Sequence, residues 1–498
     1  MTTVIGMILY LLFFIVSMLI VTFKHKNMYF LIFLRIVAYL LPLVGVLYNL
    51  YDELSLIFLG VSLPISMLVS LYNLWYSEAK YKNERNLREL IDVFGLSINY
   101  SFAAPNLVLL ISVWTISEIT GFLLVCYEGG DEALRAGYRF FFLKGMTFEL
   151  SALTVLIVLA QRIGLINALI TSFNEIPSIN VDLLLSVLIV IGFITTSAIV
   201  PLHFWLPHAH SIAPSTASAL LSGLTVKMGF YGLLRIAGFV VFPDNLWYGI
   251  LILSSITTVY GFTVLLTQHD IKRMLAYSTM GNTGLIGVLL SINMLYPSPL
   301  MFYSVIINIY AHALYKSMLF MNTGTIIVLA KTRILNELGS LAAFTPYSSL
   351  GVLFTVLSIF GVPPTVGFLG KLLAIIALLN VNNTYLAVIG LVLVAYSILI
   401  SIVYGFTILS VHWRYASISF KPIKIPLYPQ FIELLLGILG IIYGILVLLV
   451  FNLKALGMLL LVNLSSLFII VALISIFYYN IRTRIIRSLG EELVSPRH

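Results

Sequence analysis

Cysteine and charge are both scarce in this chain, and each scarcity excludes a class of protein. Cys126 is the only cysteine among 498 residues, so the chain can hold neither a cysteine-ligated iron–sulfur cluster nor an internal disulfide. Charged residues make up 9% of the chain and hydrophobic residues 61%, a balance that would leave a globular protein insoluble in water. GxGxxG, P-loop and HExxH patterns are also missing. The net charge of +8 is spread over helix ends rather than gathered into a nucleic-acid-binding patch.

The chain has instead many continuous apolar runs of about 20 residues, the length that spans a bilayer as a helix. Such runs disfavour a membrane β-barrel, whose strands alternate over about 10 residues. The first run, 4–23, lacks the basic start and cleavage site of a signal peptide, so we expect it to be retained. The sequence predicts an all-α polytopic membrane protein of about 14–15 transmembrane helices, near residues 4–23, 29–51, 54–76, 88–104, 107–126, 137–160, 181–206, 214–241, 246–266, 273–292, 299–330, 347–379, 385–411, 429–450 and 456–479.

The distribution of basic residues predicts the orientation of these helices. If the N-terminus is outside, the cytoplasmic loops hold eighteen lysines and arginines, whereas the outer loops hold only Arg162 and Lys454. Positive residues are retained on the cytoplasmic side of membranes. We therefore expect the N-terminus outside and the C-terminus in the cytoplasm.

The remaining basic residues lie inside the predicted helices. Arg35, Arg139 and Arg235 are near helix ends, where we expect them to reach the interface. Deeper positions are occupied by four lysines and two glutamates: Lys144, Lys227, Lys316, Lys371, Glu118 and Glu149. A charge at the bilayer centre costs roughly 2.5–3.5 kcal/mol on insertion scales. Interhelical ion pairs could explain any one of these residues, but six together favour a hydrated path for ions.

Lysine and histidine suit such a path because their protonation responds to burial and to neighbouring charges. His312 precedes Lys316 by four residues and therefore shares its helix face. Three further histidines, at 203, 208 and 210, lie close together, but without a nearby cysteine or carboxylate they are a poor metal site. We expect no metal in this chain.

Two predicted helices contain prolines that should break them. Pro201 interrupts 181–206, and Pro363 and Pro364 interrupt 347–379. Irregular backbone at membrane depth is tolerated where it is buried in protein or lines a cavity, and transporters place ion sites there. A plain proline kink is the alternative at either position.

A short repeat links these breaks to two of the lysines. FLKGMTF (142–148) resembles LYKSMLF (314–320), and Pro201 and Pro363 follow Lys144 and Lys316 by 57 and 47 residues. A unit of five transmembrane helices begins and ends on opposite sides of the membrane, so two such units in succession would have opposite orientations. We therefore predict a single integral domain of four parts: helices 1–3 in 1–87, a first repeat in 88–241, an inverted second repeat in 246–411, and helices 14–15 with a cytoplasmic tail in 429–498.

Four motifs resemble the antiporter-like subunits of respiratory complex I, group 4 membrane-bound hydrogenases and multisubunit Na⁺/H⁺ antiporters. They are VPLHFWLPHAHSIAPSTASALLSGLTVKMGFYGLLRI (200–236), HDIKRMLAYSTMGNTG (269–284), AHALYKSMLFMNTG (311–324) and GVPPTVGFLGK (361–371). The resemblance covers roughly residues 88–450. It assigns the ion path of that family to Glu118, Lys227, His312, Lys316 and Lys371.

One position departs from the family pattern. A lysine usually lies five residues before the VPLH proline, where this chain has Thr196. Either Lys144 or Glu149 replaces that lysine, or Glu118 works through water, or the N-terminal half-channel is inactive.

The resemblance implies an H⁺- or Na⁺-translocating subunit in the plasma membrane of a prokaryote, coupled to redox chemistry in partner chains. Other membrane subunits, including further antiporter-like chains, and a peripheral redox module would be its partners. Iron–sulfur clusters and, in a hydrogenase, a Ni–Fe centre would belong to those partners, with no cofactor in this chain. Two alternatives stay open: a redox-independent cation/proton antiporter complex, and an architectural subunit that conducts nothing.

Overall fold

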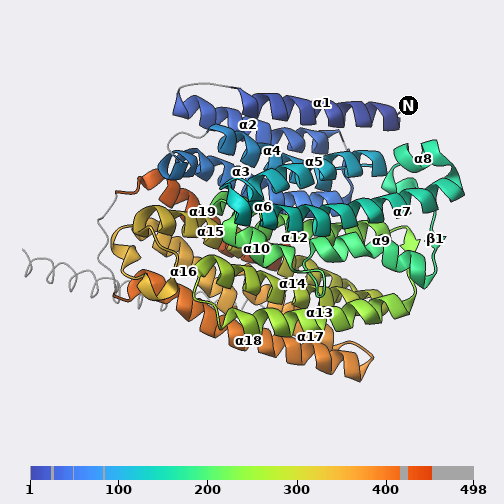
Figure 1. The fold of residues 1–498 in the computed structure, drawn as a ribbon. Helices are drawn as coiled ribbons and strands as arrows, with labels where there is room; N and C mark the ends of the chain where they lie inside the picture. Colours follow the sequence, from blue (N-terminus) through green and yellow to red (C-terminus); the bar gives the residue numbers. More distant parts are fainter. Residues whose placement is uncertain (1, 24–26, 49, 82–84, 416–423, 451–498) are drawn as a thin grey trace, which may run out of the picture.

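The computed structural model describes residues 2–23, 27–48, 50–81, 85–415 and 424–450. Figure 1 shows a bundle of helices that run side by side, with α1 and α2 at one edge and α17 and α18 at the opposite edge. Ten helical stretches of the described residues are long and apolar enough to cross a membrane, which confirms an all-α polytopic membrane protein. The predicted fifteenth helix, 456–479, lies outside the described residues.

The unbroken helices match the predicted ranges to within a few residues. Several of them have a capping residue at the start of the apolar run. In α15, for example, Ser298 is the N-cap and Pro299 is the first helical residue. These helices are α1 (Thr2–Thr22), α2 (Met28–Leu47), α3 (Glu53–Tyr81), α4 (Arg85–Phe102), α5 (Leu107–Val125), α13 (Asp244–Leu265), α14 (Ile271–Leu295), α15 (Pro299–Ala330), α18 (Thr384–Trp413) and α19 (Leu427–Val450).

The centre of the bundle is α15. In an apolar stretch of 18 residues of α15, 94% of the residues are buried, whereas the corresponding share is 33% in α2 at the edge of the bundle. It packs against α3, α14, α16, α17 and α19. The ionisable residues of α15 are therefore surrounded by protein rather than by lipid.

Two of the predicted spans are each divided into two helices. α9 (Leu183–Thr196) stops before Pro201, and the chain resumes as α10 (Trp205–Ile212). Trp205 donates its indole N–H to the Thr195 carbonyl oxygen (2.8 Å), and Val200 N–H donates to Thr257 Oγ1 (2.9 Å). α16 (Pro346–Phe360) ends at Gly361, whose φ is +79°, and α17 (Val366–Leu379) follows. Polar groups freed by the first break thus find partners inside the protein.

Two other spans contain a π-helical turn. Residues Phe140–Gly145 form one between α6 (Gly130–Arg139) and α7 (Met146–Ile163), and Leu221–Thr225 form the other between α11 (Ser215–Leu220) and α12 (Val226–Ala237). π turns are rare and concentrate at functional sites. Lys144 lies within the first turn and Lys227 directly follows the second.

Short backbone pairings join loops at both ends of the bundle. β1 (Ile179–Asn180) pairs in parallel with β2 (Val240–Val241), after the short helix α8 (Leu165–Ile170). At the other end Asp270, the cap of α14, forms an isolated bridge with Ile334. Three single 3₁₀ turns, Phe173–Glu175, Leu335–Glu337 and Leu341–Ala343, complete the loops.

Gly229 holds α12, and with it Lys227, against α9. A Cβ at Gly229 would lie 2.4 Å from the Phe193 carbonyl oxygen and 2.9 Å from the Ser197 nitrogen, which are backbone atoms. We expect Gly229→Ala to destabilise the protein by about 1–3 kcal/mol because the helices must separate. Gly249→Ala is the matched control, since nothing lies within 4 Å of a Cβ there. Thermal unfolding in detergent measures both, and an equal effect of the two variants would contradict the prediction.

Candidate ion path

Glu118 and Lys144 form a buried ion pair between α5 and the first π turn. The Lys144 Nζ contacts Glu118 Oε1, and the two side chains are 0% and 2% exposed. Trp114, one turn before Glu118, donates its indole N–H to the same oxygen (2.9 Å). The Lys144 ammonium also lies 5.1 Å from the centre of the Phe140 ring. The pair therefore neutralises both charges in an otherwise apolar layer.

Thr196, the position where the resemblance calls for a lysine, lies at the last residue of α9. Its side chain is fully buried, and its hydroxyl has no hydrogen-bond partner among the described residues. Glu149 is only partly buried and accepts a hydrogen bond from Thr115 (2.7 Å). Of the two candidate substitutes, Lys144 is the one that the structure brings to Glu118.

Lys227 projects back onto the π turn that precedes it. The side chain is 1% exposed, and its ammonium donates to the Ser222 carbonyl oxygen (2.5 Å). The Ser222 hydroxyl in turn shares a hydrogen bond with Thr279 of α14 (2.7 Å). Lys227 is also within electrostatic range of Lys316. The second π turn therefore supplies the carbonyl that holds this lysine.

His312 and Lys316 lie on the buried face of α15. Lys316 donates to the Leu275 carbonyl oxygen (2.9 Å) and to the Ser278 hydroxyl of α14, and its Nζ is 3.4 Å from the Tyr404 hydroxyl of α18. His312 is 1% exposed, and neither ring nitrogen has a hydrogen-bond partner among the described residues. It interacts electrostatically with both Lys227 and Lys316. The three groups therefore form one cluster across α12 and α15.

Lys371 lies at the second helix break. Its ammonium donates to the Ile359 carbonyl oxygen near the end of α16, and a Cβ on Gly361 would come within 3.1 Å of its Cδ. Lys371 and Tyr404 line one small cavity of about 20 Å³, which polar groups of Asn282, Asn308 and Ser401 also line. This volume is enough for one water molecule. Tyr404 thus contacts Lys316 directly and faces the cavity beside Lys371.

A basic pocket opens at the bundle end where α3 and α15 finish. Its volume is about 550 Å³. The loops predicted to be cytoplasmic contribute its charged residues, Lys80, Glu128, Glu132, Lys272, Lys331 and Arg333. Its acidic and basic groups come from loops far apart in the sequence, which agrees with these loops sharing one side of the membrane.

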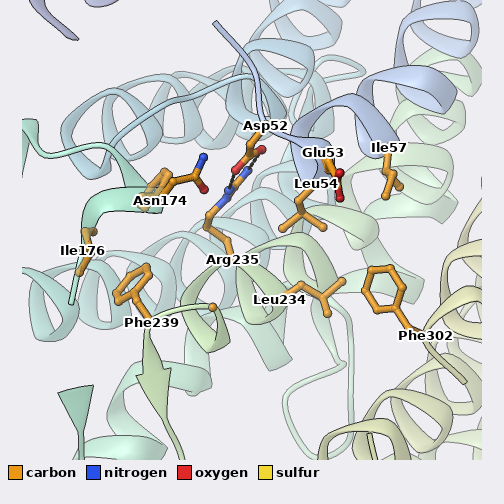
Figure 2. A pocket seen from close by; sticks show the side chains of 12 residues that line it. Asp52, Glu53, Leu54, Ile57, Asn174, Ile176, Leu234, Arg235, Phe239 and Phe302 are labelled. Carbon is orange, nitrogen blue, oxygen red and sulfur yellow. Dashed lines mark hydrogen bonds and ion pairs between the residues drawn. The ribbon is translucent and has the colours of Figure 1, made fainter. Parts of the chain in front are cut away.

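A second pocket of about 550 Å³ opens at the other end, where α3 begins and α12 ends. Figure 2 shows the Arg235 guanidinium pointing at Asp52, to which it donates from Nη2 (2.9 Å). Burial opposes ionisation of Asp52, but hydrogen bonding and charge from Arg235 outweigh it and hold the pKa of this carboxyl below its usual value. The ion pair therefore stays charged at neutral pH in the pocket wall.

Two of the three arginines near helix ends, Arg35 and Arg235, differ from the expectation that they reach the interface, whereas Arg139 is exposed. Arg235 is 5% exposed and pairs with Asp52. Arg35 is 3% exposed and pairs with Asp92 of α4, with 2.7 Å between Nη2 and Oδ2. A carboxylate within reach inside the bundle stabilises each guanidinium more than extension to the interface would.

The histidines of the α9–α10 region do not converge on a common centre with carboxylates. Within the described ranges, no three or more His, Cys, Asp or Glu residues lie together as metal ligands would. His210 stacks on Phe320 (4.7 Å between ring centres), and His203 packs against Tyr260 (5.2 Å). These two rings are packed among aromatic side chains.

Glu433 of α19 and His412 of α18 are among the buried ionisable residues that were not predicted from the sequence. They are 0% and 1% exposed. Both lie within two turns of a helix end, where a charged residue normally reaches the interface. Only the placement of α15 between their helices reveals that they face protein.

The fold and these sites define a polytopic helical membrane protein whose interior carries ionisable side chains next to irregular backbone. The chain belongs to the NADH:quinone oxidoreductase/Mrp antiporter transmembrane family, whose model matches residues 104–397, more than half of the chain. Hydrogenase-4 component B of Escherichia coli is 29% identical over 332 residues, 64% of this chain and 49% of that protein. Na⁺/H⁺ antiporter subunit A1 of Staphylococcus epidermidis is 30% identical over 358 residues, 69% of this chain and 44% of that protein. The chain thus spans about half the length of these relatives.

Two solved structures share the fold. The archaeal membrane-bound sulfane sulfur reductase contains a chain with a TM-score of 0.71 and 21% identity, covering 93% of this chain and 98% of that one. A chain of the Mrp complex from Dietzia has a TM-score of 0.66 and 17% identity, covering 79% and 81%. The architecture is therefore that of subunits found in multisubunit membrane complexes.

Proposed function

We propose that this chain is the ion-translocating subunit of a multisubunit membrane complex and carries H⁺, Na⁺ or both. The observation that supports this most strongly is the series Lys227, His312, Lys316, Tyr404 and Lys371. Lys227, His312 and Lys316 lie close enough to interact electrostatically. Lys316 contacts Tyr404 directly, and Tyr404 and Lys371 line a cavity that is large enough for one water molecule. Such a series can pass a proton because each lysine or histidine can give up its proton to the next.

In the N-terminal half, Lys144 takes the place of the lysine that is absent at position 196. It reaches Glu118 from the π turn rather than from α9. If Lys144 gives a proton to a third group, the Glu118 carboxylate stays charged without a partner. If Glu118 instead takes a proton from a third group, the Lys144 ammonium stays charged without a partner. Either change alters the electric field at neighbouring groups. Glu118 and Lys144 therefore form the proposed control pair of this half, with Glu149 as a more exposed neighbour.

The partner subunits would determine the energy source for transport, and similarity to other proteins supports two kinds of complex. Similarity to hydrogenase-4 component B and to NADH-quinone oxidoreductase subunit M of Rickettsia prowazekii favours coupling to redox subunits. These partners would hold iron–sulfur clusters and, in a hydrogenase, a Ni–Fe centre. Similarity to the Na⁺/H⁺ antiporter subunit favours the second version, a redox-independent antiporter. Co-purification in mild detergent, followed by metal analysis, distinguishes the two.

The chain would lie in the plasma membrane of a prokaryote, with the basic pocket in the cytoplasm and the Asp52–Arg235 pocket outside. The distribution of basic loops supports this orientation. The proposed arrangement of residues 88–241 and 246–411 as inverted repeats would place one helix break in each half.

Transport by the purified complex in liposomes tests the proposal. An inward K⁺ or Na⁺ gradient is imposed, and an entrapped pH dye reports H⁺ movement. We expect H⁺ flux that requires the complex and is lost in the variants discussed below. Liposomes with the fully assembled complex that show no H⁺ flux, either under the imposed gradient or with a reductant for the redox partners, would favour the architectural alternative.

A further inference from the structure

Glu433 is a buried carboxyl to which the path above gives no role. It lies in α19, two turns from its start, and is 0% exposed. Asn322 donates from Nδ2 to Oε2 (3.1 Å), and the Thr325 hydroxyl donates to Oε1. Among the described residues no lysine, arginine or histidine forms a salt bridge with it. Its hydrogen-bond partners are therefore neutral groups.

The contacts of Glu433 belong to a larger polar cluster that joins five helices. The Tyr72 hydroxyl of α3 shares a hydrogen bond with Thr325 (2.9 Å). His412 of α18 contacts the side-chain amide oxygen Oδ1 of Asn322 through Nε2 (3.1 Å) and the Ser349 hydroxyl of α16 through Nδ1 (2.8 Å). Because an amide oxygen only accepts, His412 Nε2 carries the hydrogen. In neutral His412, Nδ1 then accepts from Ser349.

Packing of α19 does not explain the carboxyl. α16 and α19 already approach through glycines: a Cβ at Gly437 would lie 2.6 Å from the Gly351 carbonyl oxygen. A buried charge without a cation is destabilising, and an apolar side chain of similar size would stabilise such a contact better. Ionisable residues kept at this cost inside a membrane are functional by default.

The cluster lies between the basic pocket and Lys316. Asn322 and Thr325 follow Lys316 on α15 by six and nine residues, which is about 9 and 14 Å along a helix axis. Ile327 and Lys331, further along the same direction, line the basic pocket. On α3, Tyr72 stacks on Tyr76, which lines that pocket too (6.0 Å between ring centres).

We propose that Glu433, positioned by Asn322 and His412, is a proton-loading site that connects the basic pocket to Lys316. This inference rests on the proposed function. A proton from water in the pocket converts the Glu433 carboxylate to the acid, and transfer onward converts the neutral Lys316 amine to the ammonium, which regenerates the carboxylate. The titratable groups that face this site are Tyr72 from α3 and His412 from α18, whereas α15 and α16 present Asn322, Thr325, Ser348 and Ser349.

Glu433→Gln in the full complex tests the inference, because it keeps the shape of the side chain and removes the exchangeable proton. We expect H⁺ flux in liposomes to fall about a hundredfold, the usual size of a lost proton-transfer group, with normal subunit content. Glu175→Gln is the matched control: it makes the same change at an exposed carboxyl of the Phe173–Glu175 turn, at the opposite end of the bundle, so its flux should stay within about threefold of the wild type. Normal flux in Glu433→Gln would overturn the inference, as would equal losses in both variants.

A measurement on the unaltered complex covers the case in which Glu433→Gln fails to assemble. Dicyclohexylcarbodiimide reacts with protonated carboxyl groups in apolar surroundings, and peptide mass spectrometry locates the product. We expect Glu433 to be modified, more slowly as the pH rises, and flux to fall in parallel. Absence of modification at every pH would overturn the inference. The proposed function fails separately, if the Lys227 variant below transports normally.

Discussion

Lys227→Ala is expected to abolish ion transport while leaving the complex assembled. The side chain is 1% exposed and lies between the π turn and the His312–Lys316 cluster, so no other described group can take its place at that point of the series. A path through a chain of proton-carrying groups loses at least about a hundredfold in rate when one member is removed. Flux in liposomes containing the purified complex measures the effect.

Stability provides an internal check on this variant. Lys227 pairs with no carboxylate among the described residues, so its removal relieves a buried charge and should leave thermal stability equal or higher. Lys424→Ala is the matched control, because Lys424 is exposed next to α19. Full transport by Lys227→Ala in a normal complex would support an architectural role instead.

Lys144→Ala is expected to have the largest effect on stability. It leaves Glu118 buried beside Trp114 with its charge unpaired, which should cost about 3–5 kcal/mol. The double variant Lys144→Met, Glu118→Gln removes both charges and should recover most of that loss. Thermal unfolding of Lys144→Met, Glu118→Gln and the double variant in detergent, each compared with the wild type, forms the cycle, and additive effects would show that the two groups do not interact.

Transport by the double variant then tests whether the N-terminal half conducts. We expect its flux to fall well below that of the wild type even though the protein is stable, because both members of the proposed control pair are gone. Normal flux would mean that the N-terminal half-channel is inactive and that Thr196 marks its loss.

Most of the helices could be predicted from the sequence because they are apolar runs with a polar residue or proline at an end, although α4 also carries Arg88, Glu89 and Asp92. α15 begins at Pro299 and ends at Ala330, the predicted limits. The two π turns could not be predicted, because Phe140–Gly145 and Leu221–Thr225 consist of residue types that α-helical turns also contain. One extra residue in a turn leaves no compositional signal.

The ionisable residues of the candidate path could be predicted because they lie far from the ends of the predicted helices. The residues that they contact could not be predicted from the sequence. Lys144 and Glu118 are 26 residues apart on different helices, and their contact depends on how the π turn rotates the lysine. Arg35 was expected at the interface, and Glu433 was not singled out, for the opposite reason. Both lie near helix ends, so depth along the helix suggested an interfacial position, whereas their neighbours α4 and α15 enclose them.

The cavity beside Lys371 restricts what can move from Lys316 toward the second helix break. Its volume of about 20 Å³ accommodates a single water molecule. A sodium ion that keeps its hydration shell is several times larger, whereas a proton needs only one oriented water between Tyr404 and Lys371. In the conformation described, we therefore expect this step to favour protons, and transfer of Na⁺ would require the cavity to widen.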